Sequence, residues 1–119
     1  LYSDEQHGIR KYYADPEKGN KEIALFGGEK FTEDIEGIAI VKTGKSSGYI
    51  IISNQQKGEF NIFDRKTNAF IKAVNLSTTE TDGCEATTIP LGTKFPNGLF
   101  VAMNDNKDFY FYDLKKIVP

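Results

Sequence analysis

Residues 48–64 read Gly48-Tyr-Ile-Ile-Ile-Ser-Asn-Gln-Gln-Lys-Gly-Glu-Phe-Asn-Ile-Phe-Asp64, two apolar runs separated by a short polar segment. β-Branched and aromatic residues dominate both runs, and neither run has apolar residues at helical spacing, which indicates strands. The polar segment ends in Gly58, and a glycine at that place is typical of a tight turn. The stretch therefore predicts an antiparallel β-hairpin.

The same pattern extends in both directions along the chain. Short apolar or alternating runs lie between clusters of Gly, Pro, Asn, Asp and Ser, which favours an all-β fold. The final segment, Asp113–Val118, fits a short helical turn or the end of a strand equally well. The runs predict strands at Gly8–Tyr13, Glu22–Phe26, Gly37–Lys42, Gly48–Ser53, Glu59–Asp64, Ala69–Asn75, Glu85–Ile89, Gly98–Met103 and Asp108–Leu114.

An internal repeat relates three hairpins of this chain. A shift of 50 residues places Ser3-Asp4-Glu5-Gln6 on Ser53-Asn54-Gln55-Gln56, and a second such shift places Gly48-Tyr49-Ile50 on Gly98-Leu99-Phe100. The repeating unit is strand, polar turn, strand. Only a few identities support it, and chance similarity among β-hairpins is the alternative explanation.

A period of this length with several strands per unit is typical of β-propeller blades. Residues 36–76 would form one complete blade, residues 1–35 the end of the preceding blade with its connection, and residues 77–119 the following blade. About two and a half blades cannot close a ring and would leave strand edges unpaired. We therefore expect a fragment of a larger propeller, completed by residues outside this chain or by another chain.

Composition excludes several classes of function. The 119 residues carry 15 basic and 17 acidic side chains, a net charge of −2, without the clustered Lys and Arg that nucleic-acid binding needs. No apolar run approaches the ~20 residues that span a bilayer, so no membrane partner is expected. The single cysteine, Cys84, rules out an intrachain disulfide and a Cys-rich zinc site.

Oxygen-bearing side chains recur at the turns of the repeat. Glu5, Gln55 and Asp105 occupy equivalent positions in the three hairpins. Asp34 and Glu36 flank Ile35, so in an extended strand both carboxylates point to one side and Ile35 to the other. Oxygen ligands without His or Cys suit Ca²⁺ or Mg²⁺. The alternative is that these acids only solvate a surface, as most such pairs do.

The run Asp34-Ile35-Glu36-Gly37 resembles the Asp-Ile-Glu-Gly segment of the β-propeller phytases, the calcium-dependent alkaline phytases. Gly48–Gln55 is similar to a strand of that family that ends in a ligand Gln, and Ser3-Asp4-Glu5 to one that carries a ligand Glu. Further similar segments, in the same order, are Phe63-Asp64-Arg65, Glu80-Thr81-Asp82-Gly83 and Phe95–Ala102. The resemblance covers essentially the whole chain.

The resemblance implies a six-bladed propeller whose Ca²⁺ ions and attacking water hydrolyse phytate, a 3-phytase-like phosphoric monoester hydrolase. It implies that Glu5, Asp34, Glu36 and Gln55 bind calcium, and that Glu5, Asp34 and Glu36 also orient the water. Asp82 matches one of two Asp residues in a family loop that is shorter here. The metal-ligand set implied by the resemblance is Glu5, Asp34, Glu36, Gln55, Asp82 and Asn104, the last through a looser match.

The family residues that grip substrate phosphates lie mostly in blades that this chain does not contain. We therefore expect the fragment alone to be inactive, and a non-catalytic phytase-like propeller that binds a ligand or acts as a scaffold is the alternative function. His7 is expected to be a turn residue and Cys84 a small packed side chain, not nucleophiles. From the resemblance alone, the protein is expected to be secreted, periplasmic or at a bacterial cell surface.

Overall fold

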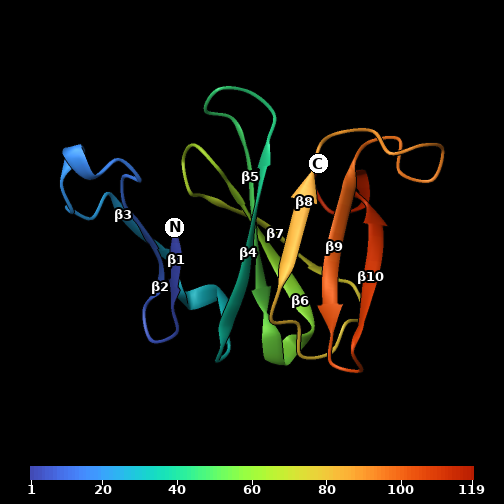
Figure 1. Ribbon diagram of the computed structural model, residues 1–119. Helices are drawn as coiled ribbons and strands as arrows, with labels where there is room; N and C mark the ends of the chain where they lie inside the picture. The colour runs from blue at the N-terminus through green and yellow to red at the C-terminus, as the bar shows by residue number, and fades with distance from the viewer.

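The computed structural model describes residues 1–119 and consists of strands in three antiparallel sheets, with short 3₁₀ turns and no α-helix (Figure 1). The sheets have the orders β1-β2-β3, β4-β5-β6-β7 and β10-β9-β8. The all-β prediction is confirmed, and the sheets have the arrangement of propeller blades. The strands are β1 (Tyr2–Asp4), β2 (Gly8–Lys11), β3 (Ala24–Gly27), β4 (Ile35–Lys42), β5 (Gly48–Asn54), β6 (Glu59–Asp64), β7 (Phe70–Asn75), β8 (Cys84–Thr87), β9 (Leu99–Asn104) and β10 (Asp108–Asp113).

Each strand predicted from the sequence is present, with ends that differ by a few residues. The prediction missed β1, which is too short for its alternation to be visible. The undecided C-terminal segment forms a 3₁₀ turn, Leu114–Lys116, capped by the side chain of Asp113. The four-stranded sheet runs from β4 to β7, and the division of the chain into blades at residues 35/36 and 76/77 stays a prediction.

The two central strands of the middle sheet, β5 and β6, are buried on both faces, which explains the continuous apolar run of β5. Alternate side chains of a strand point to opposite faces. Ile50 and Ile52 therefore pack toward the first sheet in a cluster with Ile9 and Phe63, whereas Ile51 packs toward the third. A strand buried on both faces is mainly apolar, and the buried polar side chains of these strands, Ser53, Asn54 and Asn61, are all hydrogen-bonded. Each buried Ile contributes about 1.5–3 kcal/mol relative to its exposed state.

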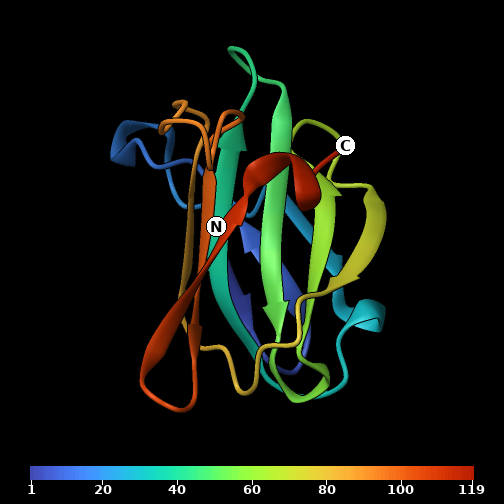
Figure 2. The ribbon, with the colours of Figure 1, turned by 90° about the vertical axis from the view of Figure 1, so that its right-hand side faces the viewer.

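A second, larger cluster joins the middle sheet to the third sheet. Phe60 and Phe100 meet edge to face with ring centroids 5.2 Å apart, and both are fully buried. The 3₁₀ turn after β10 adds Leu114 and Ile117 to this cluster. Figure 2 shows this turn crossing the end of the middle sheet.

The sequence repeat corresponds to repeated backbone geometry. Gly48 and Gly98 both have positive φ, and their carbonyl groups accept the equivalent N–H groups of Arg65 and Leu114. A Cβ on Gly48 would lie 1.9 Å from the carbonyl oxygen of Val41, so only glycine fits there. The repeated glycines thus mark equivalent positions at the starts of β5 and β9, in the second and third sheets.

The β1–β2, β5–β6 and β9–β10 turns and the first residues of β4 and β8 all lie at one end of the sheets, the lower end in Figure 1. This end carries most of the side chains that the sequence marked as candidates. No helix in the structure is long and apolar enough to cross a membrane.

Candidate functional site

Five of the predicted site residues come from four different segments at the lower end of the sheets. Glu5 lies in the β1–β2 turn, Asp34 directly precedes β4, and Glu36 is the second residue of that strand. Gln55 opens the 3₁₀ turn after β5, and Asp82 lies just before β8. The turns within sheets and the connections between sheets therefore bring together residues that are far apart in the sequence.

A β-bulge at the start of β4 shapes this region. Ile35 pairs with Asn54, whereas the next pair in the ladder is Ile38 with Ile52, so β4 carries one extra residue. Ile35 is 2% exposed and faces the core, as the Asp-Ile-Glu pattern predicted. Because of the bulge, the alternation of side chains between the two faces of the strand is interrupted between Ile35 and Ile38.

Gly37 within this bulge allows a close approach of another segment. A Cβ at Gly37 would lie 2.5 Å from the carbonyl oxygen of Asp82 and 2.9 Å from the amide nitrogen of Cys84. Those distances are too short for any side chain, so the backbone before β8 can lie against β4 only because this residue is glycine. The glycine thereby brings Asp82 close to Glu36.

Glu36 lies among the other acids. Partial burial raises the pKa of Glu36 above its usual value, and the charges of Asp82, Glu5 and Asp34 raise it further, in that order. The ion pairs in the structure join Arg10 to Asp4 and Glu22, and His7 to Asp4, so they involve none of these four acids. The four carboxylates therefore form an uncompensated negative cluster, which we call the acidic cluster.

Two neighbouring glutamines hold members of this cluster. Gln55 Nε2 donates to Asp82 Oδ1 at 2.6 Å. Gln56 Nε2 donates to Asp34 Oδ2 at 2.7 Å, and Gln56 Oε1 accepts the Asp34 N–H at 3.0 Å. Sequence reasoning singled out Gln55 but missed Gln56, because its only signal was a place beside Gln55 in a polar turn.

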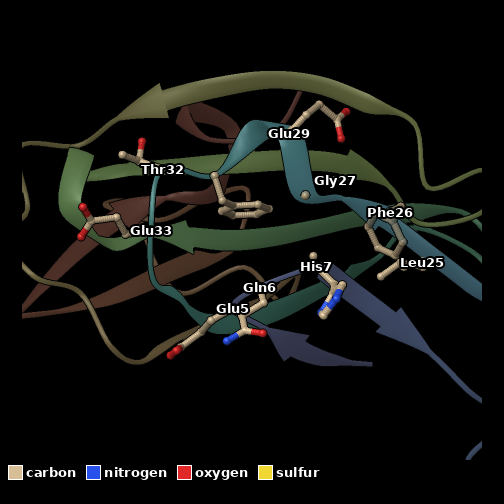
Figure 3. Close-up of a pocket in the computed structure, with 12 residues that line it drawn as sticks. Glu5, Gln6, His7, Leu25, Phe26, Gly27, Glu29, Thr32 and Glu33 are labelled. Atoms are coloured by element: carbon tan, nitrogen blue, oxygen red, sulfur yellow. The ribbon is translucent and has the colours of Figure 1, made fainter.

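Two open hollows adjoin the acidic cluster. Glu5 and Glu36 both line one of 420 Å³, on the side of β1. Glu5 also lines a second hollow of 450 Å³, in which Figure 3 shows Glu5 and Gln6 across from Thr32 and Glu33 of the segment that leads to β4. The acids are therefore reachable from solvent.

The Asn104 side chain makes no hydrogen bond to a residue of the acidic cluster. It is 5% exposed at the end of β9, and its Oδ1 accepts the Thr79 N–H at 2.7 Å. Its repeat equivalent Asn54 does the same with the Thr32 N–H at 3.2 Å. Both asparagines thus anchor the segments that lead to the next sheet, and the role of Asn104 as a metal ligand stays a prediction.

The donor set of the acidic cluster fits a hard divalent cation. It offers only carboxylate and amide oxygens, the ligands that Ca²⁺ prefers, and no basic side chain neutralises it. No three His, Cys, Asp or Glu residues lie close enough together in this structure to hold an ion. Glu5, Asp34, Glu36, Gln55 and Asp82 would therefore have to converge around any ion that they share.

The remaining reactive side chains lie outside the acidic cluster. Burial raises the pKa of Cys84 to about 12, so this residue is a thiol packed against the core, as expected. His7 contacts Asp4 through Nδ1 at 3.1 Å within the β1–β2 turn, which agrees with a turn residue. Neither residue belongs to the acidic cluster.

Comparison with known proteins adds an independent result. The family model described as Phytase matches residues 1–109. The chain is also similar to a 3-phytase of Bacillus subtilis (strain 168), with 29% identity over 112 residues that cover 86% of this chain and 29% of that protein. It therefore spans less than a third of the length of this curated relative.

Proposed function

Because this chain belongs to the phytase family, we propose that it is part of a calcium-dependent phosphatase that releases phosphate from myo-inositol hexakisphosphate. The observation that carries this proposal is the position of Glu36 among Asp82, Glu5 and Asp34 without a basic partner. Uncompensated carboxylates would repel a phosphate ester. Carboxylates can hold such a substrate only through cations that lie between them and the phosphate group.

Each residue of the proposed site has a role that follows from its surroundings. Bound Ca²⁺ would neutralise phosphate oxygens and lower the pKa of a water molecule. Oxygen atoms of Glu5, Asp34, Gln55 and Asp82 would bind the calcium ions and so fix their positions. Glu36 would bind the same ion through a carboxylate oxygen and, from its place among the other acids, would orient the attacking water and accept its proton.

The proposal has three finer parts. Attack at the 3-phosphate is proposed from the name of the Bacillus subtilis relative. Residues 1–119 alone are proposed to be inactive, because substrate phosphates also need cationic side chains and this end of the sheets offers mainly acids. The remaining blades of a six-bladed propeller are proposed to supply those side chains.

The test is phosphate release from myo-inositol hexakisphosphate by the full-length protein that carries this chain, with added Ca²⁺ and after chelation. Glu36→Gln is expected to lower kcat by about 10²-fold or more, the usual contribution of a general base. Glu85→Gln is the matched control, because Glu85 is an exposed acid on β8 that does not act on Glu36.

The outcomes separate the candidate functions. Phosphate release that is unaffected by chelation would contradict the calcium mechanism. A protein that binds Ca²⁺ or inositol phosphate but releases no phosphate would be the alternative, a non-catalytic ligand-binding or scaffold propeller.

A further inference from the structure

We infer that Gln56 is a positioning residue of this site, which holds Asp34 and Gln55 in the arrangement that binds the cation. This inference rests on the proposed calcium-dependent function. Gln56 itself is exposed, yet its side chain makes two hydrogen bonds to Asp34 and a longer one, 3.4 Å, from its Nε2 to Gln55 Oε1. An exposed glutamine that makes three such bonds has its amide plane fixed.

The three bonds use both the donor group and the acceptor group of the Gln56 amide. A glutamine amide has two N–H donors and one carbonyl acceptor. Nε2 of Gln56 donates to a carboxylate oxygen of Asp34 and, over a longer distance, to the amide oxygen of Gln55, and the Gln56 carbonyl accepts the Asp34 backbone N–H. Gln56 thus joins two proposed metal ligands that precede β4 and follow β5.

The bond to Asp34 involves only Oδ2, so the second carboxylate oxygen of Asp34 accepts no hydrogen bond within the chain. That leaves one oxygen of known orientation for a cation. A neutral donor also stabilises the carboxylate without adding charge to a cluster that is already repulsive. Partners of this kind orient metal ligands, and their loss typically lowers metal affinity by about 10- to 100-fold.

The backbone makes the same connection. The N–H of Gln55 donates to the carbonyl oxygen of Asp34 at 3.4 Å, just before Ile35 pairs with Asn54. This contact is independent of the Gln56 side chain. Removing the Gln56 amide should therefore loosen the Asp34 carboxylate while the strand pairing remains.

Gln56→Met in the full-length protein tests this inference, because methionine keeps the length of the side chain but loses its donors and acceptor. The matched control is Lys57→Ala, the next residue of the same 3₁₀ turn, which is exposed. Two quantities are measured against Ca²⁺ concentration, the Tm and the rate of phosphate release. We expect the half-saturating Ca²⁺ concentration of Gln56→Met to rise about 10-fold, with kcat at saturating Ca²⁺ and the Tm without Ca²⁺ close to wild type.

The outcomes distinguish this inference from the proposed function. If wild type responds to Ca²⁺ and Gln56→Met gives the same half-saturation as wild type and Lys57→Ala, the positioning role is wrong while the proposed function stands. If Gln56→Met lowers the Tm equally with and without Ca²⁺, Gln56 is a purely structural residue and the inference is likewise wrong. If wild type does not respond to Ca²⁺ at all, both the proposed function and this inference are wrong.

Discussion

Glu36 shows how a single residue acquires its properties from segments that are distant in sequence. Asp34 comes from the residue directly before its strand, Glu5 from the β1–β2 turn and Asp82 from the segment before β8. Each of these charges raises the pKa of Glu36 in addition to the effect of burial. A raised pKa means that the folded protein holds this proton more tightly than the unfolded chain, so ionised Glu36 destabilises the metal-free fold.

Replacing Glu36 should therefore stabilise the metal-free protein while removing its response to calcium. The destabilisation by Glu36 grows as the pH rises from its usual pKa of 4.5 through the raised value. We expect Glu36→Gln to raise the free energy of unfolding at neutral pH by up to about 0.5 kcal/mol, the usual size for partly exposed charges. Urea unfolding at several pH values measures this, and a decrease in stability at neutral pH would contradict the electrostatic account.

Asp4 shows the opposite shift. Hydrogen bonds from Arg10 and then His7 lower the pKa of Asp4 from 3.8 to about 2. Its stabilising effect is therefore present above pH 3.8 and is lost as the pH falls toward about 2. Arg10→Gln should return the pKa of Asp4 toward 3.8, which the carboxyl carbon shift in an NMR pH titration reports. Equal midpoints for Asp4 in wild type and Arg10→Gln would show that the ion pair does not form in solution.

At the scale of elements, all strands except the three-residue β1 were predictable, because each is an apolar or alternating run bounded by turn residues. The Asp-Ile-Glu pattern also placed Ile35 in the core correctly. The bulge in β4 was not predictable, because one extra residue leaves no mark in the composition of the strand. The nearness of Asp82 to Glu36 depends on the close approach of backbone at Gly37, a contact between segments that local patterns do not encode.

Gly37 should consequently be needed for both stability and the site. The Cβ of Gly37→Ala would overlap backbone atoms of Asp82 and Cys84, so the segment before β8 has to move. We expect a loss of about 1–3 kcal/mol in the free energy of unfolding and a pKa of Glu36 closer to its usual value. Gly83→Ala is the control, because a Cβ there has no atom within 4 Å. Two variants of equal stability would contradict the close approach.

At the scale of the whole molecule, the three sheets bury equivalent positions to different extents. By strand register, Ile9, Phe60 and Phe109 occupy the same place in successive sheets. Ile9 and Phe60 are fully buried against the next sheet, whereas Phe109 is 65% exposed on a face that also carries Phe111. An apolar sheet face of this kind favours association with another protein surface.

Residues 1–119 produced alone should therefore self-associate in solution. Phe109→Lys should reduce the apparent molecular mass measured by sedimentation, because it places a charge on the exposed apolar face. Tyr13→Lys is a suitable comparison, since Tyr13 is also exposed but lies outside the sheets. A wild-type chain that remains monomeric at high concentration would show that the exposed face with Phe109 and Phe111 does not drive association.

The most direct test of the proposed calcium site is a crystal structure of the full-length protein grown with Ca²⁺, with the ions located by anomalous scattering. We expect Ca²⁺ at about 2.3–2.6 Å from a carboxylate oxygen of Glu36 and from an oxygen of at least one of Glu5, Asp34 or Asp82. A well-ordered structure with Ca²⁺ bound elsewhere, and with basic side chains paired to these acids, would contradict it.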